Sequence, residues 1–319
     1  MNAHWNKSLL LLTAGDLIDG FKEYEWRMKR KEFTKKDFAC PALSDQDIFN
    51  KKVIVYSEQG LGDAIQFARY LPLLKSKGCV VTLECNDLLY KLFKPVHGID
   101  ELVSEDSAPL KSNKYDFNIS LLSLPNYFKT TLKSIPANVP YINVPENKKE
   151  EWRGKLGNLE LTVMRENVFK IGLVWGGNPM HGKDNKRSIP LNDFSIFSSI
   201  KGIKVFSLQK GKSLEQIKNA GFIIENLSEK GQETFLDTAA IIENLDLVIS
   251  VDTSVVHLAG AMGKPVWTLL PYYSDWRWLK DRNDSPWYPA MRLFRQPEPG
   301  RWDVVLNNVK QELIQLCLR

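Results

Sequence analysis

The chain has 319 residues, of which 43% are apolar and 25% charged, with a formal net charge of +5. This length suits two soluble globular domains, and the absence of any apolar run near 18 residues excludes a membrane-spanning helix from the prediction. The charge is mild and its lysines are scattered, which disfavours nucleic-acid binding. Four cysteines without a CxxC pair indicate neither a zinc site nor a redox motif, so we expect reduced thiols and a cytoplasmic protein.

Residues 1–42 are predicted as a separate helical segment. Leu9, Leu12, Leu17 and Phe21 follow helical spacing, and a Gly15-Asp16 turn divides two short helices. One such unit cannot bury its apolar face alone, as in a single helical repeat.

Residues 43–150 are predicted as a first Rossmann-like domain, with strands at 53–56, 80–83 and 116–119 that alternate with helices. The turn Gly60-Leu61-Gly62-Asp63 follows the first of these strands. Asp63 then begins a helix, where its carboxylate is either a general base or only an N-cap. The turn is not a GxGxxG motif, so a dinucleotide cofactor is disfavoured.

Residues 151–319 are predicted as a second Rossmann-like domain, with strands at 170–175, 203–207, 222–225, 247–251 and 266–270. A terminal helix at 303–317 packs either here or back on the first domain. The expected fold class is therefore α/β, with two Rossmann-like domains facing a cleft, where ligands bind beyond the carboxyl ends of the strands.

The segment 247–265 carries the strongest functional signal. A continuous β-branched run ends in Asp252-Thr253-Ser254, which are N-cap residues, and a helix with small residues follows. A helix N-terminus at the end of a buried parallel strand is a ready anion site. His257 lies four residues after Thr253, on the same helix face. We expect a phosphate or pyrophosphate here; a purely structural cap is the alternative.

Other candidates follow neighbouring strands. Gly176 and Gly177 come after the strand at 170–175 and allow close approach to a ligand, and the planar fork of Arg187 suits a phosphate. Lys210 follows another strand and can neutralise phosphate, although a surface lysine is the alternative. Further candidates for cleft contacts are Gln59, Gly62, Gln66, Asp237, Thr238, Asp275 and Trp276, and helix capping explains Asp237 and Thr238 equally well.

A metal site is not expected. Asp45-Gln46-Asp47 matches the DxD of metal-dependent glycosyltransferases, but it precedes the first strand instead of following one. No His, Asp or Glu cluster in the sequence has metal-ligand spacing.

In order along the chain, these motifs resemble glycosyltransferase family 9, the ADP-heptose:lipopolysaccharide heptosyltransferase group. The family hallmarks stand here as Gly62-Asp63-Ala64-Ile65 and as the segment from Asp252 to Ala259. The match is closer to family-9-like domains that follow tetratricopeptide repeats in bacterial proteins, which share EQGLGDAIQFARYLP, SLLSLP, RSIPL, SLQKG, DTAA, DWRWL and MRLFRQ over roughly residues 10–305.

This resemblance implies a GT-B fold, no catalytic metal and inversion at the anomeric carbon. Asp63 would deprotonate the acceptor hydroxyl, while Lys210 and the 252–257 segment hold the donor diphosphate and stabilise the leaving group. Ser254 departs from the glycine usual in the lipopolysaccharide enzymes. The donor-binding residues implied by motif and resemblance together are Lys210, Asp252, Thr253, Ser254, Val255, His257, Arg187, Gly176 and Gly177.

The expected partners are a nucleotide-diphosphate sugar and a glycan, lipid or protein acceptor, without nucleic acid; contact with a membrane surface stays open. Two alternatives also stay open: a non-catalytic module that binds nucleotide, sugar or a partner protein, and a nucleotide-sugar epimerase of the same fold.

Overall fold

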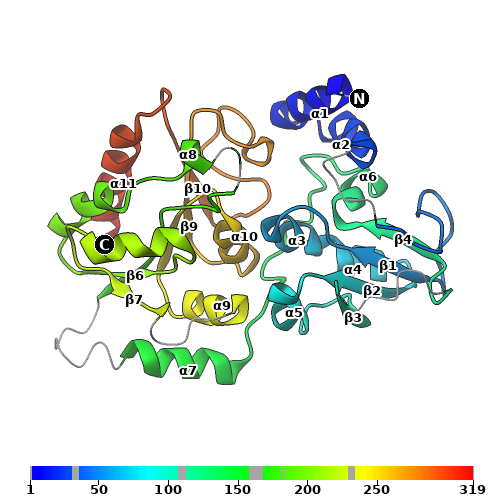
Figure 1. Ribbon diagram of the computed structural model, residues 1–319, viewed down its shortest axis with the longest axis horizontal. Helices are drawn as coiled ribbons and strands as arrows, with labels where there is room; N and C mark the ends of the chain where they lie inside the picture. Colours follow the sequence, from blue (N-terminus) through cyan, green and yellow to red (C-terminus); the bar gives the residue numbers. More distant parts are fainter. Residues whose placement is uncertain are drawn as a thin grey trace. The chain divides into compact units, whose positions relative to one another are not determined.

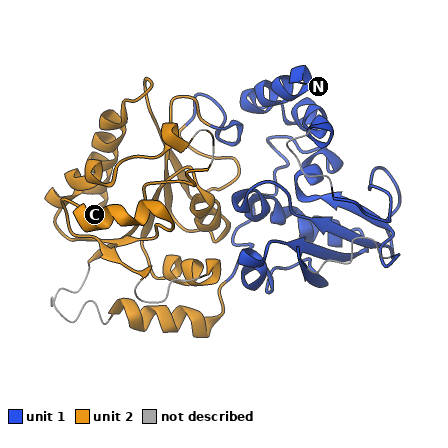
Figure 2. Cartoon of the chain, in the orientation of Figure 1, with its two compact units in different colours: residues 1–143, 275–282 blue, residues 144–274, 283–319 orange. Residues whose placement is uncertain are grey.

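A computed structural model describes residues 2–30, 36–106, 113–157, 168–180, 182, 184–228 and 234–318. The chain forms two compact units (Figure 2). Unit 1 comprises Met1–Asn143 and Asp275–Arg282, and unit 2 comprises Val144–Ser274 and Asn283–Arg319. We call Asp275–Arg282 the returning segment, because it packs in unit 1 although the chain on both sides of it belongs to unit 2. Among the described residues, no helix is long and apolar enough to cross a membrane.

Unit 1 contains one four-stranded parallel sheet with short helices (Figure 1). Its strands are β1 (Lys52–Tyr56), β2 (Val80–Cys85), β3 (Glu101–Ser104) and β4 (Phe117–Ser120). Its helices are α1 (Asn2–Ala14), α2 (Leu17–Tyr24), η1 (Glu25–Lys29), α3 (Leu61–Phe67), η2 (Ala68–Tyr70), α4 (Leu71–Lys75), α5 (Asp87–Phe93), η3 (Leu121–Ser123), α6 (Leu124–Tyr127) and, from the returning segment, η7 (Trp276–Trp278).

The strand order of this sheet is β3-β2-β1-β4, and all the pairs are parallel. Residues 53–55 of β1 are fully buried, as expected for a strand covered on both faces. Since the chain runs from β1 to β2 and β3 on one side and places β4 on the other, the order reverses between β1 and β4. Ligands of open α/β sheets bind at such a switch point, beyond the carboxyl ends of the two strands.

The N-terminal helices pack inside unit 1. Phe21 contacts Phe67 of α3 and Trp276 of η7 edge-on, with ring centroids 6.3 and 5.6 Å apart. Tyr24 also packs on Trp276, at 5.9 Å. The apolar face of α2, predicted from its spacing, thus finds its partners in α3 and in the returning segment.

Unit 2 contains a six-stranded parallel sheet. Its strands are β5 (Phe169–Val174), β6 (Ile203–Ser207), β7 (Glu225–Asn226), β8 (Leu247–Val251), β9 (Val266–Leu270) and β10 (Met291–Arg295). Its helices are α7 (Glu146–Gly157), α8 (Asp184–Arg187), η4 (Leu191–Ser199), η5 (Lys212–Asn219), α9 (Phe235–Glu243), α10 (Ser254–Ala261) and α11 (Trp302–Cys317).

The strand order is β10-β9-β8-β5-β6-β7, the order of a dinucleotide-binding Rossmann sheet. β5 pairs with β6 on one side and with β8 on the other, so the switch point of unit 2 lies between β5 and β8. The loops that follow these two strands, which carry Gly176 and Asp252, therefore begin at neighbouring strand ends.

The terminal helix α11 belongs to unit 2. Val305, Val309 and Leu313 lie in one buried cluster with Leu173 of β5 and Phe194 of η4. The sequence left open whether this helix packs back on the first domain; its apolar face lies in the core of unit 2.

Two strands were not predicted, and one was misplaced. β3 and β10 are short edge strands that carry charged residues, such as Glu101 and Arg292, so they lack the continuous apolar run of a central strand. The strand predicted at 222–225 is only Glu225–Asn226, because Phe222 and Ile224 pack on the core from a loop and Ile223 is 87% exposed.

Candidate functional site

A hydrogen bond joins the two loops at the switch point of unit 2. Nη1 of Arg187, in the loop region after β5, donates to the backbone oxygen of Asp252, directly after β8, at 2.9 Å. Two residues that the sequence predicted as phosphate contacts are thereby neighbours. Both residues lie beyond the carboxyl ends of β5 and β8, which is where Rossmann units bind phosphates.

The guanidinium of Arg187 is held in a fixed plane. Its Nε donates to Oδ1 of Asp184 at 3.1 Å, and the arginine side chain is 18% exposed. A Cβ at Gly177 would collide with the ends of the Asp184 and Arg187 side chains, so both would have to move from their present positions. The N–H of Gly177 donates to Ser188 Oγ at 3.0 Å. Gly177 therefore makes room for the arginine, and its own donor already has a partner.

Gln209 accounts for Gly176 in the same way. Oε1 of Gln209 accepts from the N–H groups of Trp175 and Gly176 at 3.1 and 2.8 Å, and its Nε2 donates to the Gly176 oxygen at 2.9 Å. A Cβ on Gly176 would lie 2.5 Å from Ser213 Oγ. The sequence predicted that these glycines let a ligand approach the backbone; in the structure both admit neighbouring side chains, and both N–H groups are engaged.

The helix α10 begins as predicted, with Thr253 as its N-cap. Thr253 Oγ1 accepts from the N–H of Val255 at 3.3 Å and lies 3.2 Å from Ser250 Oγ. Ser254 is the first helical residue. The first N–H groups of any helix have no partner within the helix, and the positive end of its dipole lies there. This end of α10 adjoins the Arg187–Asp252 contact, so the Arg187 guanidinium lies near the positive end of the helix dipole.

His257 lies inside unit 2 instead of at its surface. The residue is 5% exposed, and its Nδ1 is 2.9 Å from the hydroxyl of Tyr288. Tyr288 packs over Gly260, where a Cβ would lie 2.5 Å from the phenol ring. Tyr288 thus contacts α10 at both His257 and Gly260, and the sequence did not reveal these contacts.

Lys210 and Asp237 both form hydrogen bonds with Thr234, the N-cap residue of α9. Lys210 Nζ donates to the Thr234 oxygen at 3.3 Å and lies 6.0 Å from the ring centroid of Phe235. Asp237 closes a capping box: its Oδ2 accepts from the N–H and the hydroxyl of Thr234 at 2.9 and 2.7 Å. The Thr238 hydroxyl donates to the Thr234 oxygen at 3.2 Å. Capping, which the sequence left as the alternative, accounts for Asp237 and Thr238.

Burial and hydrogen bonding compete at Asp237. Burial alone raises the pKa of this carboxyl, but hydrogen bonds from Thr234 and from the Trp152 indole outweigh it, and the net pKa is below its ordinary value. The ionised form of Asp237 is therefore part of the folded structure of unit 2.

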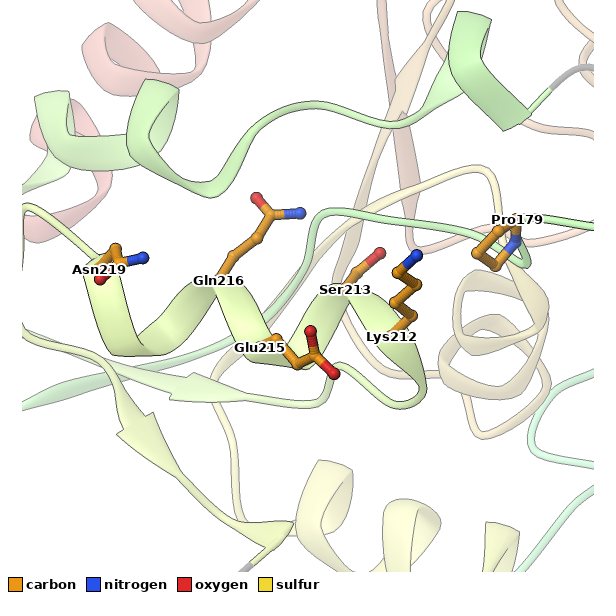
Figure 3. Close-up of a pocket in the computed structure, with 6 residues that line it drawn as sticks. All are labelled: Pro179, Lys212, Ser213, Glu215, Gln216 and Asn219. Carbon is orange, nitrogen blue, oxygen red and sulfur yellow. The ribbon is translucent and has the colours of Figure 1, made fainter.

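A surface pocket of about 380 Å³ lies at the same edge of the sheet, on the β6 side. Figure 3 shows its wall, with Ser213, Gln216 and Asn219 along η5, and Pro179 of the loop after β5 at the end away from Asn219. Lys212 and Glu215 complete the lining. Because Ser213 also abuts Gly176, the pocket adjoins the loop that carries the switch-point glycines.

In unit 1, Asp63 occupies the third position of α3 and not its cap. Gly60 is the N-cap, and its N–H donates to Asp63 Oδ2 at 2.8 Å. The aspartate side chain is 17% exposed. Burial raises the pKa of the Asp63 carboxyl above its ordinary value, even though Arg277 and the Gly60 N–H act against the rise.

Arg277, in the returning segment, is the main partner of Asp63. Its Nη2 donates to Asp63 Oδ1, its Nε to Gln66 Oε1 at 2.9 Å, and its Nη1 to Asp275 Oδ1 at 2.7 Å. The ring of Trp276 lies 4.3 Å from the guanidinium carbon. Of the residues predicted as cleft contacts, Gln66, Asp275 and Trp276 thus surround Arg277, together with Asp63 itself.

The remaining predicted residues of unit 1 lie in the turn before α3. Gln59 adopts a positive φ of 63°, and its side chain shares hydrogen bonds of 3.1 to 3.2 Å with the Tyr24 hydroxyl. Gly62 lies in the first turn of α3. Next to them, Glu58 accepts from Arg27 of η1. The N-terminal helices therefore hold the turn that leads to Asp63.

Arg27 and Gln209 were not predicted as site residues. Arg277 and Tyr288 lie in an aromatic, arginine-rich segment that the sequence offers as a lining for a sugar or base pocket, but their contacts with Asp63 and His257 were not predicted. A usable signal exists for Arg277, since an arginine between Trp276 and Trp278 stands in an aromatic segment that is expected to be buried, and a buried arginine needs a carboxylate. For metals, the described residues contain no group of three His, Cys, Asp or Glu side chains arranged to hold an ion.

Comparison with known proteins agrees with the resemblance seen in the sequence. Residues 222–298 match the model of glycosyltransferase family 9 (heptosyltransferase). A curated relative, Protein FlbA of Caulobacter vibrioides, is 24% identical over 329 aligned residues, which cover 96% of this chain and 54% of that protein. The chain thus spans about half the length of this relative.

Two solved structures share the fold. The E. coli ADP-heptose lipopolysaccharide heptosyltransferase II superposes with a TM-score of 0.61 at 13% identity, over 84% of this chain and 98% of that one. A family 9 glycosyltransferase from Veillonella parvula gives a TM-score of 0.57 at 14% identity, over 84% and 90%. The expected α/β fold of GT-B class and the resemblance to family 9 are confirmed; at these identities the structures speak for the fold alone.

Proposed function

We propose that this chain is an inverting, metal-independent glycosyltransferase that moves a sugar, of the heptosyl or hexosyl type, from a nucleotide-diphosphate sugar to an acceptor hydroxyl. The family 9 match over residues 222–298 supports the general class. That match includes the whole of α10 and the returning segment with Arg277.

One observation carries the donor half of the proposal: the hydrogen bond between Arg187 and the Asp252 oxygen at the switch point of unit 2. It brings a planar cation to the N-terminus of α10, and these two features together favour a diphosphate. Lys210 adds a second cation at the end of β6. The leaving diphosphate is then stabilised by protein charge and helix dipole, which is electrostatic catalysis without a bound cation.

We assign the nucleoside to the open surface pocket on the β6 side of this point. The pocket volume of about 380 Å³ is of the size of small-molecule sites, and Ser213, Glu215 and Gln216 provide hydroxyl, carboxylate and amide groups for a ribose. Because the pocket adjoins Gly176 through Ser213, a nucleotide bound there has its phosphates near the loop that leads to Arg187.

Asp63 provides the acceptor half. Its carboxylate accepts the proton of the acceptor hydroxyl while that oxygen attacks the anomeric carbon, the bond to the diphosphate breaks, and the configuration inverts. Each carboxylate oxygen of Asp63 has one protein donor, Arg277 or the Gly60 N–H, and so keeps a second lone pair for a proton. The acceptor is a glycan, lipid or protein hydroxyl, and a nucleotide-sugar donor together with free thiols suits the cytoplasm.

A second function, a binding module without turnover, has one specific observation in its favour. The ion pair between Asp63 and Arg277 is what a structural carboxylate in a folded core also shows. In that case unit 2 binds a nucleotide, and Asp63 only stabilises unit 1.

The first test is a thermal-shift screen of the purified chain against ADP, UDP, GDP, CDP and CMP, in EDTA throughout. A ligand that binds only the folded state raises the melting temperature by mass action. A shift with one diphosphate in EDTA supports the donor site and identifies the base. Release of that diphosphate from its sugar conjugate in the presence of acceptor then separates transferase from binding module. No shift with any nucleotide would contradict the donor site.

A further inference from the structure

The inference concerns Arg277, and it rests on the proposed role of Asp63. Arg277 reaches unit 1 on the returning segment, and its side chain is 9% exposed. Three of its nitrogen atoms have acceptors on three different residues, Asp63, Gln66 and Asp275. The Trp276 ring covers one face of the guanidinium. An arginine held in this way has one orientation, and so does every carboxylate that it contacts.

Asp63 is fixed from two directions. The Gly60 N–H binds Oδ2 and Arg277 binds Oδ1, so the carboxylate plane is set by one backbone group and one side chain. The Gly60 N–H belongs to the N-cap of α3. It orients the Asp63 carboxylate but carries no full positive charge that could balance it. Arg277 is therefore the group that both orients and electrically balances Asp63.

The orientation of the Gln66 side-chain amide is determined by its contact with Arg277. The Gln66 side chain is fully buried, and its Oε1 accepts from Arg277, while its Nε2 has no hydrogen-bond partner among the residues that the structure describes. Rotating the amide would turn a donor toward the arginine, so the contact with Arg277 decides the amide orientation. A buried amide left half-satisfied indicates that this cluster is organised around the cation.

We propose that Arg277 is a positioning residue for Asp63, which keeps that carboxylate charged and in a single orientation for removal of the acceptor proton. Arg277 itself touches neither sugar nor diphosphate in this scheme. The returning segment therefore carries an essential part of the acceptor half of the site.

The electrostatic surroundings of Asp63 favour this role. Burial raises the pKa of Asp63, and nearby carboxylates act in the same direction, so Arg277 is the principal group that opposes the rise. A neighbouring arginine typically lowers the pKa of an aspartate by about 1–3 units. The charged or titratable groups around Asp63 are Arg277, Asp275, Glu58 and Tyr24, and Glu58 is in turn paired with Arg27.

The test is a carboxyl titration by carbon NMR of aspartate-labelled protein, in which D63N identifies the Asp63 signal. In R277Q we expect the Asp63 midpoint to rise by about one pH unit or more. R277K keeps a charge without the fork, and its midpoint should stay closer to wild type than that of R277Q. The control is R292Q, since Arg292 belongs to an exposed pair with Glu312 in unit 2; it should leave the midpoint unchanged.

An unchanged Asp63 midpoint in folded R277Q overturns the proposal. If R277Q does not fold, R277K decides: a midpoint near that of wild type supports the role of the charge, and a rise of a full unit contradicts it. The titration needs neither donor nor acceptor. A protein with the expected shift and no sugar transfer would therefore contradict the proposed function while the Arg277–Asp63 coupling stands. Where transfer is measured, the acidic limb of the kcat profile should move with the midpoint and the donor KM should not.

Discussion

Arg27 and Glu58 meet at the switch point of the unit 1 sheet. Nε and Nη2 of Arg27 both donate to Oε1 of Glu58, at 3.1 and 2.6 Å, and the arginine side chain is completely buried. The same guanidinium reaches Ser123, after β4, at 2.8 Å. A side chain from the N-terminal helices thus connects the residues that follow β1 and β4, at the carboxyl ends of these two strands. The N-terminal segment is part of the unit and not an appendage to it.

Removal of that arginine should destabilise unit 1 strongly. In R27M, Glu58 and Glu25 lose a buried cation, and breaking a buried ion pair in this way costs about 3–5 kcal/mol. Urea unfolding of R27M and of R301Q provides the comparison, since Arg301 and Asp303 form an exposed pair, and exposed pairs contribute little to stability. Equal losses in the two variants would mean that the Arg27 network is not a stabilising one.

Substitution of Asp63 should separate chemistry from binding. D63N keeps the size of the side chain and loses its basicity, so we expect sugar transfer to fall by about 10²- to 10⁴-fold. The nucleotide-induced thermal shift should persist, because the donor residues lie in unit 2. Transfer at the wild-type rate would remove Asp63 as the base. Loss of the thermal shift in a folded D63N would mean that the aspartate contributes to the donor site instead.

Arg187 should determine diphosphate affinity. A hydrogen bond to a charged group contributes about 1.5–3 kcal/mol, so R187Q should weaken binding of the nucleoside diphosphate by about 10- to 100-fold. Calorimetric titration of R187Q against wild type measures this, and R301Q controls for loss of one positive charge from the surface. Nucleoside monophosphate binding should change less, since fewer phosphate oxygens are present. Wild-type affinity in R187Q would place the diphosphate elsewhere.

Two glycines offer a matched pair. G260A places a methyl group where the Tyr288 ring packs, and overpacking of this kind costs about 1–3 kcal/mol. In α7, an added Cβ on Gly154 would meet no described side chain or distant backbone within 4 Å, and G154A should stabilise the chain by about 0.5–1 kcal/mol. Unfolding midpoints of the two variants should therefore move in opposite directions. An unchanged unfolding midpoint in G260A would mean that the Tyr288 ring moves aside at no cost in free energy.

Asp237 predicts a pH dependence of stability. Its pKa is lower in the folded state than its ordinary value of 3.8, so its ionised form stabilises the fold. This contribution is complete above the unfolded pKa and is lost as the pH falls through the folded one. The stability difference between wild type and D237N should be constant from pH 7 to about 5 and shrink below about pH 4. Thermal melts across this range measure it; a difference that grows toward low pH would reverse the sign.

The features that the sequence predicts are those set by residues close together along the chain; contacts between distant parts of the chain are not predicted. β1 and β8 were predicted because a buried parallel strand is a run of β-branched residues, and the N-cap at Thr253 because its partner Val255 is two residues away. The contact between Asp63 and Arg277 joins positions 214 residues apart, and no local pattern encodes it. The glycines of the switch point were recognised as special, but the reason, room for Arg187 and Ser213, required the fold.

The returning segment also has a consequence for the order of events during synthesis. Residues up to Asn143 contain all four strands of the unit 1 sheet, while Asp275–Arg282 is synthesised roughly 130 residues later. At typical elongation rates this interval is on the order of ten seconds. During it Asp63 and Gln66 lack Arg277, and Phe21 lacks the indole of Trp276. Until the returning segment is synthesised, the Asp63 carboxylate lacks its arginine partner and the Phe21 ring lacks its contact with Trp276. Folding of unit 1 is therefore completed only when residues 275–282 are available.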